Sequence, residues 1–431
     1  MPRSGLDTCW HVPVISALAI VVVSIGFGNS GFFFVGFMEE FHCNRAAATW
    51  PNTLLSMGVG ISGVAVWVLQ RWLSIFSIAQ AASTLSWIGM IASAFSPDMP
   101  WMTVTFGVIH GIGVGMLTMA LGIIVVMFFD KYRGIACGIK FSGYSLSPLV
   151  FARILVPMKE AYEFRGTLLL CGAIMMHATV LAFLIRKPLW MTEKPNLPQC
   201  HIIPETLPAS HAGHAQTISA SIETSNSTFT TKQNRGIRES LSSIRKPMFY
   251  VIVIYSAVTD YSETSFLSTI VDYAMDKGSS LNEAQSLVLY FSFAQLLGRI
   301  LLPLISDLRF LRRSALVTIS VILLGCTFLS LPHVTSFSYL VPVCLVAATL
   351  IGCVTSMETV LMADYLGVDA ISLCWVGDGA ASLPFYLCSS TILGRFRDSM
   401  GSYDNFYRLL AGIQFFVGLM FCMVGSYENR K

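Results

Sequence analysis

Long apolar stretches separated by short polar segments run along most of the chain, as two sets of six on either side of one long polar interval. Each stretch is close to the ~20 residues of helix that cross the ~30 Å hydrocarbon core of a bilayer. The pattern predicts an all-α membrane protein with twelve transmembrane helices. We expect them at Val12–Phe37, Ala47–Leu69, Leu73–Phe95, Trp101–Met127, Gly134–Pro157, Thr167–Ile185, Met248–Met275, Ala284–Ile305, Ala315–Leu331, Tyr339–Ala363, Ile371–Leu393 and Tyr407–Val424.

The polar interval divides the chain into two halves. From Lys187 to Arg245 it is dense in Ser, Thr, Pro and His and shows no sustained apolar period. Such a composition buries too little apolar surface to offset the entropy of ordering the chain. We therefore predict an N-terminal six-helix half over residues 1–187, a disordered cytoplasmic linker over 188–246 and a C-terminal six-helix half over 247–431.

The charge of the loops predicts the orientation of the helices. With the amino terminus inside, Lys and Arg are more frequent in the cytoplasmic loops than in the opposite loops, also when the long linker is left out. The positive-inside rule then places both termini in the cytoplasm. The first apolar stretch, from Val12, exceeds the ~7–15 residues of a signal-peptide core and lacks a small-residue cleavage pattern, so we expect it to span the membrane.

The composition agrees with a multi-pass membrane protein. Of the 431 residues, 54% are hydrophobic and 12% are charged, against ~25% charged residues in an average soluble domain. The net charge of +3 is too small to indicate a nucleic-acid partner. The 11 cysteines lie mostly inside apolar runs, without CxxC or Cys/His clusters, and indicate neither a disulfide framework nor a metal site. We expect no cofactor, and the lipid bilayer as a partner.

Local motifs add a family resemblance. At the start of the fifth span, Phe128–Gly138 combines an aromatic pair, basic residues and Ala-Cys-Gly, and Asp7–Trp10 carries an acid and a tryptophan before the first span. Two six-span halves joined by a cytoplasmic linker form the plan of the major facilitator superfamily. The two motifs resemble signatures of its monocarboxylate transporter family (solute carrier family 16), although both glycines of the first signature are absent here. Similar segments follow at Tyr162–Gly166, Asp272–Gly278, Leu361–Gly367 and Gly401–Tyr407.

The resemblance implies a fold and a function. The fold is the major facilitator superfamily fold, with twelve helices in two six-helix halves. The function is secondary transport of small monocarboxylic acids such as lactate and pyruvate, as organic anions and together with protons, by alternating access. A plasma-membrane location and a single-span accessory subunit are also implied. The chain contains no GxSxG, HExxH or P-loop motif, so we expect no enzyme.

Arg299 is the first candidate for substrate binding. It lies well inside the eighth span, where a cation costs ~2.5–3.5 kcal/mol unless it faces protein or water. Its guanidinium fork suits a carboxylate, and its position matches the arginine with which the family holds the substrate carboxylate. The alternative is a salt-bridge cluster on the cytoplasmic side together with Asp307 and Arg309.

Two positions depart from the family pattern. Gln295 stands one turn before Arg299, where proton-coupled members carry an acid; it cannot titrate, and we expect it to donate a hydrogen bond to the substrate. The family's first-span lysine is also absent, because Gly28 aligns near that position, with Asn29 beside it as a substrate-binding candidate.

Three further residues complete the predicted substrate site. Lys140 in the fifth span either replaces the missing cation or extends its ammonium group to the membrane surface. Phe33 and Phe291 are expected to shape the apolar part of the pocket.

Acidic groups in other spans are candidates for proton coupling. Asp260 and Glu263 lie one turn apart in the seventh span, and carboxylates this close repel each other, which favours proton binding. The alternative is a vestibule in which both stay ionised. Glu358 and Asp378 either act in transport or pair structurally with a buried cation. His110 is either a proton carrier or a hydrogen-bonded packing residue.

Charged residues near the cytoplasmic ends of the spans are candidates for conformational gating. We expect them to form clusters that stabilise the outward-facing state, with plain solvation as the alternative. They are Asp130, Lys131, Arg133, Asp307 and Arg309.

Two other functions compete with proton-linked transport. The missing lysine and the uncharged Gln295 favour a proton-independent, facilitative carrier of an amphipathic or aromatic organic acid. The Ser/Thr-rich linker is compatible with a non-transporting membrane sensor or scaffold.

Overall fold

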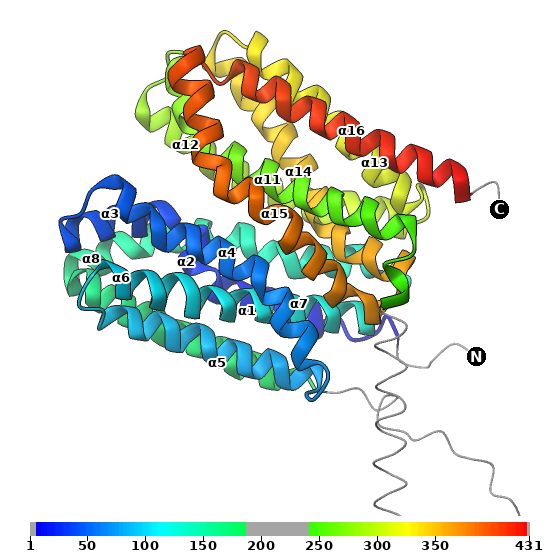
Figure 1. Cartoon of the computed structure of the whole chain (residues 1–431), viewed down its shortest axis with the longest axis horizontal. Coiled ribbons are helices and arrows are strands. Elements are labelled where there is room, and N and C mark those ends of the chain that lie inside the picture. Colours follow the sequence, from blue (N-terminus) through cyan, green and yellow to red (C-terminus); the bar gives the residue numbers. More distant parts are fainter. Residues whose placement is uncertain (1–5, 187–240, 429–431) are drawn as a thin grey trace, which may run out of the picture.

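The described part of the chain folds into helices that run in alternating directions. A computed structural model describes residues 6–186 and 241–428, and within these ranges it contains helices and no strand. The predicted linker over 188–246 lies outside the described residues except for 241–246, which lead into the second half. Figure 1 shows two helical bundles, one from each half of the chain.

The first bundle comprises eight α-helical segments, the last of them long, and one π-helical segment. They are α1 (His11–Val23), α2 (Ile25–Gly28), α3 (Ser30–Phe41), α4 (Arg45–Leu69), α5 (Ile75–Ala94), α6 (Met99–Met102), the π-helical segment η1 (Thr103–His110), α7 (Gly111–Phe128) and α8 (Arg133–Leu184). Local capping explains several starts: the side chains of Asn44, Ser74 and Asp98 accept backbone N–H groups of the first turns of α4, α5 and α6.

The second bundle begins after the linker. Its elements are α11 (Pro247–Asp276), α12 (Leu281–Asp307), α13 (Arg313–Ser330), η2 (Leu331–His333), α14 (Phe337–Leu366), η3 (Val368–Ala370), α15 (Ile371–Gly394), η4 (Arg395–Ser399) and α16 (Asp404–Glu428). Ser280 and Glu283 form a capping box at the start of α12.

The helices match the twelve predicted spans. Among the described residues, nine helical stretches are long and apolar enough to cross a membrane. One of them, α8, has 52 residues and turns at Glu163, where φ is 60° and ψ is 178°, so it holds the fifth and sixth spans. The segments α1 to α3 form the first span, and the 30-residue α11 forms the more polar seventh.

The first span differs from the continuous helix that the apolar run predicts. It is interrupted at Ser24 and Asn29, the residues between α1, α2 and α3. The Ser24 hydroxyl donates to the carbonyl of Ile20 at 2.5 Å, and the Asn29 amide donates to the carbonyl of Ile25 at 3.0 Å. Side chains of this kind compete with the helical hydrogen bonds and so permit the breaks.

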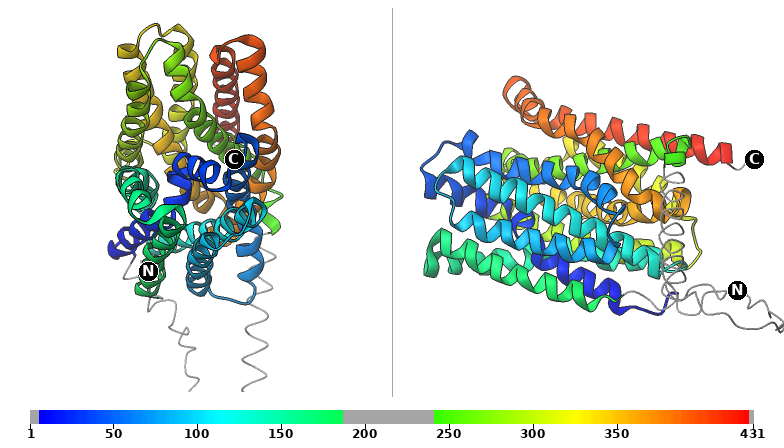
Figure 2. Two further views of the ribbon diagram at one scale, coloured as in Figure 1. Left: turned by 90° about the vertical axis from the view of Figure 1, so that its left-hand side faces the viewer. Right: turned by 60° about the horizontal axis from the view of Figure 1, so that its bottom comes forward.

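The apolar core is shared between the halves at only one end of the molecule. One buried cluster joins residues from both halves, among them Val12, Phe129, Met248 and Phe421, all near the end where α1 begins and α16 ends. Two other clusters each belong to one half. We call the shared end the closed end. The ribbons of the two halves converge there and diverge toward the opposite end (Figure 1), onto which the left panel of Figure 2 looks.

Close backbone approach between the halves depends on glycine. α8 packs on α12, and α4 packs on α15. A Cβ atom at Gly138 would lie 1.8 Å from the carbonyl oxygen of Arg299, and one at Gly379 would lie 2.3 Å from the carbonyl oxygen of Gly60. Both distances are far below any real Cβ contact, so these crossings require residues without a side chain.

Candidate functional site

Six ionisable side chains lie within the spans near the boundary between the halves. We call them the central charged layer: Lys140 on α8, Asp260 and Glu263 on α11, Arg299 on α12, Glu358 on α14 and Asp378 on α15. Two are cations and four are carboxylates. Lys140 is fully buried, and only 3% of Arg299 is exposed.

Arg299 connects the two halves. Its Nη1 donates to the carbonyl oxygen of Phe141 on α8 at 2.6 Å, and its Nη2 lies 3.5 Å from Oε1 of Glu263 on α11. The guanidinium carbon is 5.9 Å from the ring centroid of Tyr144, also on α8. Its buried Nε has no hydrogen-bond acceptor among the described residues. The structure therefore places this arginine in the interface, as a substrate-binding role requires, and away from Asp307 and Arg309.

Gln295 holds the same carboxylate as Arg299. Its Nε2 donates to Oε1 of Glu263 at 2.6 Å, and its Oε1 accepts a hydrogen bond from the hydroxyl of Ser145 at 3.0 Å. Because Ser145 lies on α8, the amide is a second polar link between the halves. Two donors of α12 thus converge on one oxygen of an acidic side chain.

Lys140 does not extend to the surface. Its ammonium nitrogen lies 3.5 Å from the ring centroid of Phe141 and has no hydrogen-bond acceptor in the described part of the chain. The side chain is fully buried, which contradicts the alternative of an ammonium group at the membrane surface. The nearby Trp375 and Thr359 belong to the other half, so this lysine also lies in the interface.

The other three carboxylates of the layer form no ion pair within the described residues. Glu358 Oε1 accepts from the Trp375 indole at 3.3 Å, and Asp378 Oδ1 accepts from the Ser382 hydroxyl at 3.1 Å. Among the described ion pairs none includes Asp260, Glu358 or Asp378. Glu358 interacts electrostatically with the buried Lys140 without forming an ion pair, whereas Asp378 has no cation partner in the described part of the chain.

The two predicted pocket phenylalanines lie elsewhere. Phe33 packs against Phe37 and Phe106 inside the cluster that belongs to the N-terminal half, and Phe291 packs on Phe266 at a centroid distance of 5.4 Å in the C-terminal cluster. Each points into the core of its own half, because the interior of each bundle offers more apolar contact than the polar interface. The structure does not bring either to the guanidinium of Arg299.

Asn29 and His110 are also apart from the central charged layer. The Asn29 amide is used at the break between α2 and α3. His110 is fully buried, and its Nδ1 lies 2.9 Å from the carbonyl oxygen of Ser86 on the neighbouring α5. It lies near Gly26 and Gly89 within the N-terminal half. This is the arrangement expected of a hydrogen-bonded packing residue, the second of the two alternatives for His110.

A second set of charges joins the halves at the closed end. We call it the gate cluster: Asp130, Arg133, Asp307, Arg313 and Asp364. Asp364 accepts from Nη1 of both arginines at 2.8 Å, and Arg313 Nη2 lies 3.0 Å from Asp307. Arg313 also donates to the backbone oxygen of Asp130 at 3.0 Å.

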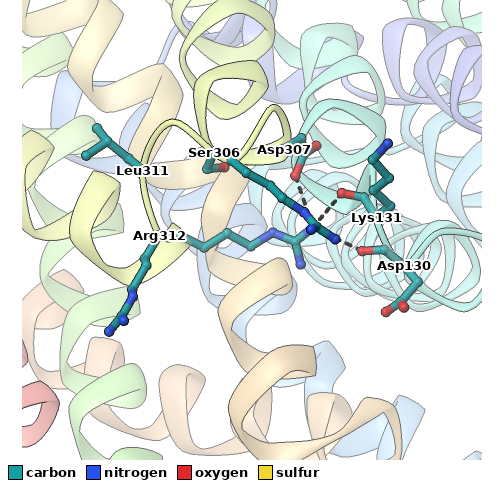
Figure 3. Close-up of a pocket in the computed structure, with 8 residues that line it drawn as sticks. Asp130, Lys131, Ser306, Asp307, Leu311 and Arg312 are labelled. Atoms are coloured by element: carbon teal, nitrogen blue, oxygen red, sulfur yellow. Dashed lines mark hydrogen bonds and ion pairs between the residues drawn. The ribbon is translucent and has the colours of Figure 1, made fainter. Parts of the chain in front are cut away.

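Three members of the cluster, Asp130, Asp307 and Arg313, line a surface pocket, shown in Figure 3, where dashed lines reach Asp307 and the backbone of Asp130 and Lys131. Asp307 Oδ2 accepts the N–H of Ile135 at 2.8 Å, so a carboxylate of the second half lies at the N-terminus of α8 in the first half. This is the favourable end of a helix for an anion. The arrangement fits a lock between the halves.

Two predicted gating residues act differently from the prediction. Arg309 has a left-handed backbone with φ of 65° and is exposed, and Arg313 instead forms the ion pair with Asp307. The ammonium of Lys131 lies over the Tyr132 ring at 4.7 Å, and its backbone carbonyl takes part in the cluster. Arg313 is the first residue of α13, and the sequence alone does not show which way its side chain points. Asp364 lies in the family-like segment Leu361–Gly367, and this resemblance was the sequence signal that could have added it to the predicted gating residues.

The N-terminal segment is tied to the gate cluster through Asp7. The Asp7 carboxylate accepts backbone N–H groups of Asp130, Lys131 and Tyr132 at 3.0, 3.3 and 3.1 Å. Trp10 packs on Phe129 at a centroid distance of 4.9 Å. The two family-like motifs of the first half are thus in direct contact.

Ion pairs at the opposite end stay within one half. Lys159 pairs with Glu39 and Arg165 with Glu40 in the first half. In the second half Arg397 donates to Asp276 at 2.7 Å, a hydrogen bond that raises the pKa of Arg397. Among the described residues, ion pairing therefore joins the halves at the closed end, and at the level of Arg299 a hydrogen bond to the carbonyl of Phe141 joins them.

Comparison with known proteins identifies the family. The family model of the Major Facilitator Superfamily matches residues 16–374. The chain belongs to the Major Facilitator Superfamily. It is similar to FucP in the outward conformation, with a TM-score of 0.65 and 14% identity over 97% of this chain and 98% of that one. A second similar structure is the proton:xylose symporter XylE, with a TM-score of 0.64 and 14% identity over 95% of this chain and 94% of that one.

Curated relatives carry the name of the family that the motifs resemble. Monocarboxylate transporter 12 of Xenopus laevis is 23% identical over 96% of this chain and 86% of its own length. Monocarboxylate transporter 14 of Homo sapiens is 26% identical over 46% of this chain and 39% of its own. Monocarboxylate transporter 9 of Pongo abelii is 29% identical over 42% of this chain and 35% of its own. The resemblance and the fold are confirmed: the protein is a multi-pass membrane transporter homologous to monocarboxylate transporters, and not an enzyme.

Proposed function

We propose that this transporter moves small monocarboxylic acids across the membrane by alternating access, with the substrate carboxylate bound by Arg299. The observation that carries the proposal is a nearly buried guanidinium on α12 that also bonds to the backbone of α8 in the other half. A cation in this place can bind an anion, and its hydrogen bond to α8 depends on the relative position of the halves. Gln295, which contacts both α8 and α11, is the second polar group of this site.

Lys140 is the second cation in this proposal. Its ammonium interacts electrostatically with Glu358 but has no hydrogen-bond partner among the described residues, and a buried charge that lacks such a partner is costly. An anion that enters between the halves supplies that partner. Lys140 thereby takes the place of the first-span lysine of the family.

Alternating access in this proposal operates through the gate cluster. Its ion pairs and the shared apolar core hold the closed end together. The loops rich in Lys and Arg lie at this end, so we assign it to the cytoplasm and the arrangement to an outward-facing state. Asp130, Arg133 and Asp307 keep the gating role expected of them, with Arg313 and Asp364 added.

Proton coupling is assigned to the three carboxylates of the layer that form no ion pair among the described residues. Asp260 interacts electrostatically with Glu263, Glu358 and Asp378. Four carboxylates against two cations leave the layer with excess negative charge, and intramembrane charges without a partner are costly. Binding of protons by Asp260, Glu358 or Asp378 relieves this excess, and symport follows if those protons travel with the substrate.

A proton-independent carrier of larger organic acids is the second candidate. It is favoured by the uncharged Gln295 beside Arg299. The plasma-membrane location, the cytoplasmic termini and the accessory subunit stay predictions in either case.

The test is uptake of labelled lactate, pyruvate and a panel of aromatic acids into cells that express the wild type, Arg299→Ala or Arg299→Lys. Surface expression is matched, and external pH is set acidic or neutral. We expect acid-stimulated lactate or pyruvate uptake that Arg299→Ala abolishes and Arg299→Lys restores in part. Uptake that is indifferent to pH and confined to aromatic acids favours the second candidate. Absence of flux for every acid contradicts both.

A further inference from the structure

Glu263 occupies the donors that the proposed function assigns to the substrate. One oxygen of its side chain, Oε1, accepts from Gln295 at 2.6 Å and lies 3.5 Å from Arg299 Nη2. Both donors belong to α12, whereas Glu263 comes from α11. The site therefore already holds a carboxylate, and that carboxylate belongs to the chain itself.

We infer that Glu263 is an internal counter-anion, which competes with the substrate carboxylate for Arg299 and Gln295. This inference rests on the proposed function for the identity of the substrate group. It assigns Glu263 a task different from proton coupling: to neutralise Arg299 whenever the site holds no substrate.

The hydrogen bonding of Arg299 to Glu263 is incomplete, which leaves donors that a competing anion can use. The Nη2 contact is long at 3.5 Å, and Nε has no acceptor among the described residues. Nε and Nη2 form one edge of the guanidinium, the edge that binds a carboxylate through two parallel hydrogen bonds. A substrate carboxylate on this edge gains two such bonds, whereas Glu263 uses a single oxygen against it.

Burial differs between the two partners of the ion pair. The Glu263 side chain is 21% exposed, and that of Arg299 is 3% exposed. A displaced Glu263 therefore has access to solvent, while an Arg299 without an anion has none. Moving Glu263 out of the site therefore costs little free energy only if another anion takes its place at Arg299.

The neighbours of Glu263 act in the same direction. Its helix and those packed against it bring further ionisable groups close to this level, mainly acids, which repel Glu263 from the layer once it leaves the guanidinium. These groups are Asp260 on α11, Lys140 and Tyr144 on α8, Glu358 on α14, and Asp378 and Tyr386 on α15.

The inference separates two modes of transport. In net uptake the empty carrier must return, and Glu263 pairs Arg299 during that step. In exchange the carrier returns with substrate, which pairs Arg299 itself. Removing the charge of Glu263 should therefore slow net uptake, spare exchange and tighten apparent substrate binding, because a competitor is lost.

The experiment uses the full-length protein in proteoliposomes, with labelled lactate as the probe. Glu263→Gln is compared with the wild type and with Glu160→Gln, a change of the same kind at an exposed position of α8. Uptake is measured into empty vesicles and into vesicles preloaded with unlabelled lactate. For Glu263→Gln we expect net uptake to fall and the half-saturating concentration for exchange to fall, each by about 5-fold or more, the usual scale of coupling between two ligands. Glu160→Gln should match the wild type.

Parallel loss of both modes, or a half-saturating concentration that is unchanged or higher, overturns the inference. Glu263→Asp keeps the charge and serves if the glutamine variant does not fold: it should retain net uptake and bind lactate more tightly, because the shorter side chain competes less well. An aspartate variant with weaker lactate binding also overturns the inference.

Thermal unfolding separates failure of the inference from failure of the proposed function. If the wild type carries no lactate, the proposed function fails, but a double-mutant cycle over Glu263→Gln and Arg299→Ala still reports the pair. The inference then requires the double variant to be more stable than Glu263→Gln alone, because the double variant also removes the cation that Glu263→Gln leaves without its carboxylate. Additive effects would show that the two side chains are independent.

Discussion

The gate cluster and the central charged layer both join the halves through charged side chains, but they balance their charges differently. In the gate cluster Asp307 and Asp364 each have an arginine within 3.0 Å, and Asp364 has two. In the central charged layer, as far as the described residues show, Lys140 has no hydrogen-bond acceptor and three of the four carboxylates form no ion pair. The first arrangement is complete by itself, whereas the second lacks partners.

The difference indicates which region holds the conformation and which one awaits a ligand. Buried charges with all their partners in place stabilise one arrangement and resist change. A layer that lacks partners is stabilised by whatever supplies them, and a ligand shifts a conformational equilibrium only through such differential contacts. The gate cluster is therefore expected to govern the resting state, and the central charged layer the response to substrate and protons.

Arg313→Ala should break the gate cluster with the largest effect. The Asp307 side chain is fully buried, and removal of one partner from a buried ion pair costs up to about 3–5 kcal/mol. We expect the closed end to open. Cys137, which is fully buried beside this cluster, then becomes reactive toward a membrane-permeant thiol reagent, as followed by mass spectrometry of the labelled residue.

Arg397→Ala is the matched control, because it removes an ion-paired arginine at the opposite end. It should leave Cys137 protected. Equal labelling of Cys137 in both variants would contradict the assignment of the lock to the closed end.

Lys140→Met should affect stability in the opposite direction from Arg313→Ala. Removing a buried charge removes the cost of its desolvation, and this ammonium has no hydrogen-bond acceptor among the described residues to lose. We expect an unchanged or higher temperature of unfolding in detergent, together with a marked loss of lactate uptake.

Lys277→Met provides the contrast, because Lys277 lies 3.6 Å from Asp404 in an ion pair. That variant should be slightly less stable than the wild type. If Lys140→Met destabilises the protein more than Lys277→Met does, Lys140 is a structural partner within the layer.

Asp7→Ala should have the smallest effect. It removes the acceptor of three backbone N–H groups, but the site is partly exposed and water replaces much of the contact, so we expect a loss of about 1 kcal/mol. In a chain of this length that lowers the unfolding temperature by about 2 °C or less. Asp7→Asn retains an uncharged acceptor and should lose less. If Asp7→Asn lowers the stability as much as Asp7→Ala does, or more, the charge and not the hydrogen bonds ties this segment to the gate cluster.

Much of the fold and part of the site followed from the sequence. The twelve spans were predictable, because apolar length is a property of each segment and the bilayer requires it. Arg299 was predictable as a residue that faces protein or water, because a cation that faces lipid inside a span is costly. Phe33 and Phe291 were not correctly placed, since an apolar residue on a spanning helix has no mark in the sequence that distinguishes the core of a half from the interface.

The sequence by itself determined that this protein spans a membrane many times, that it is built of two halves, and which ionisable residues lie inside the spans. Only the tertiary structure decided which of those residues meet. Glu263 and Arg299 are far apart in the chain, as are Arg133 and Asp364. Their meeting depends on the rotation and register of packed helices, which side-chain packing across the interface sets, down to the glycine at 138 that lets α8 approach the backbone of Arg299.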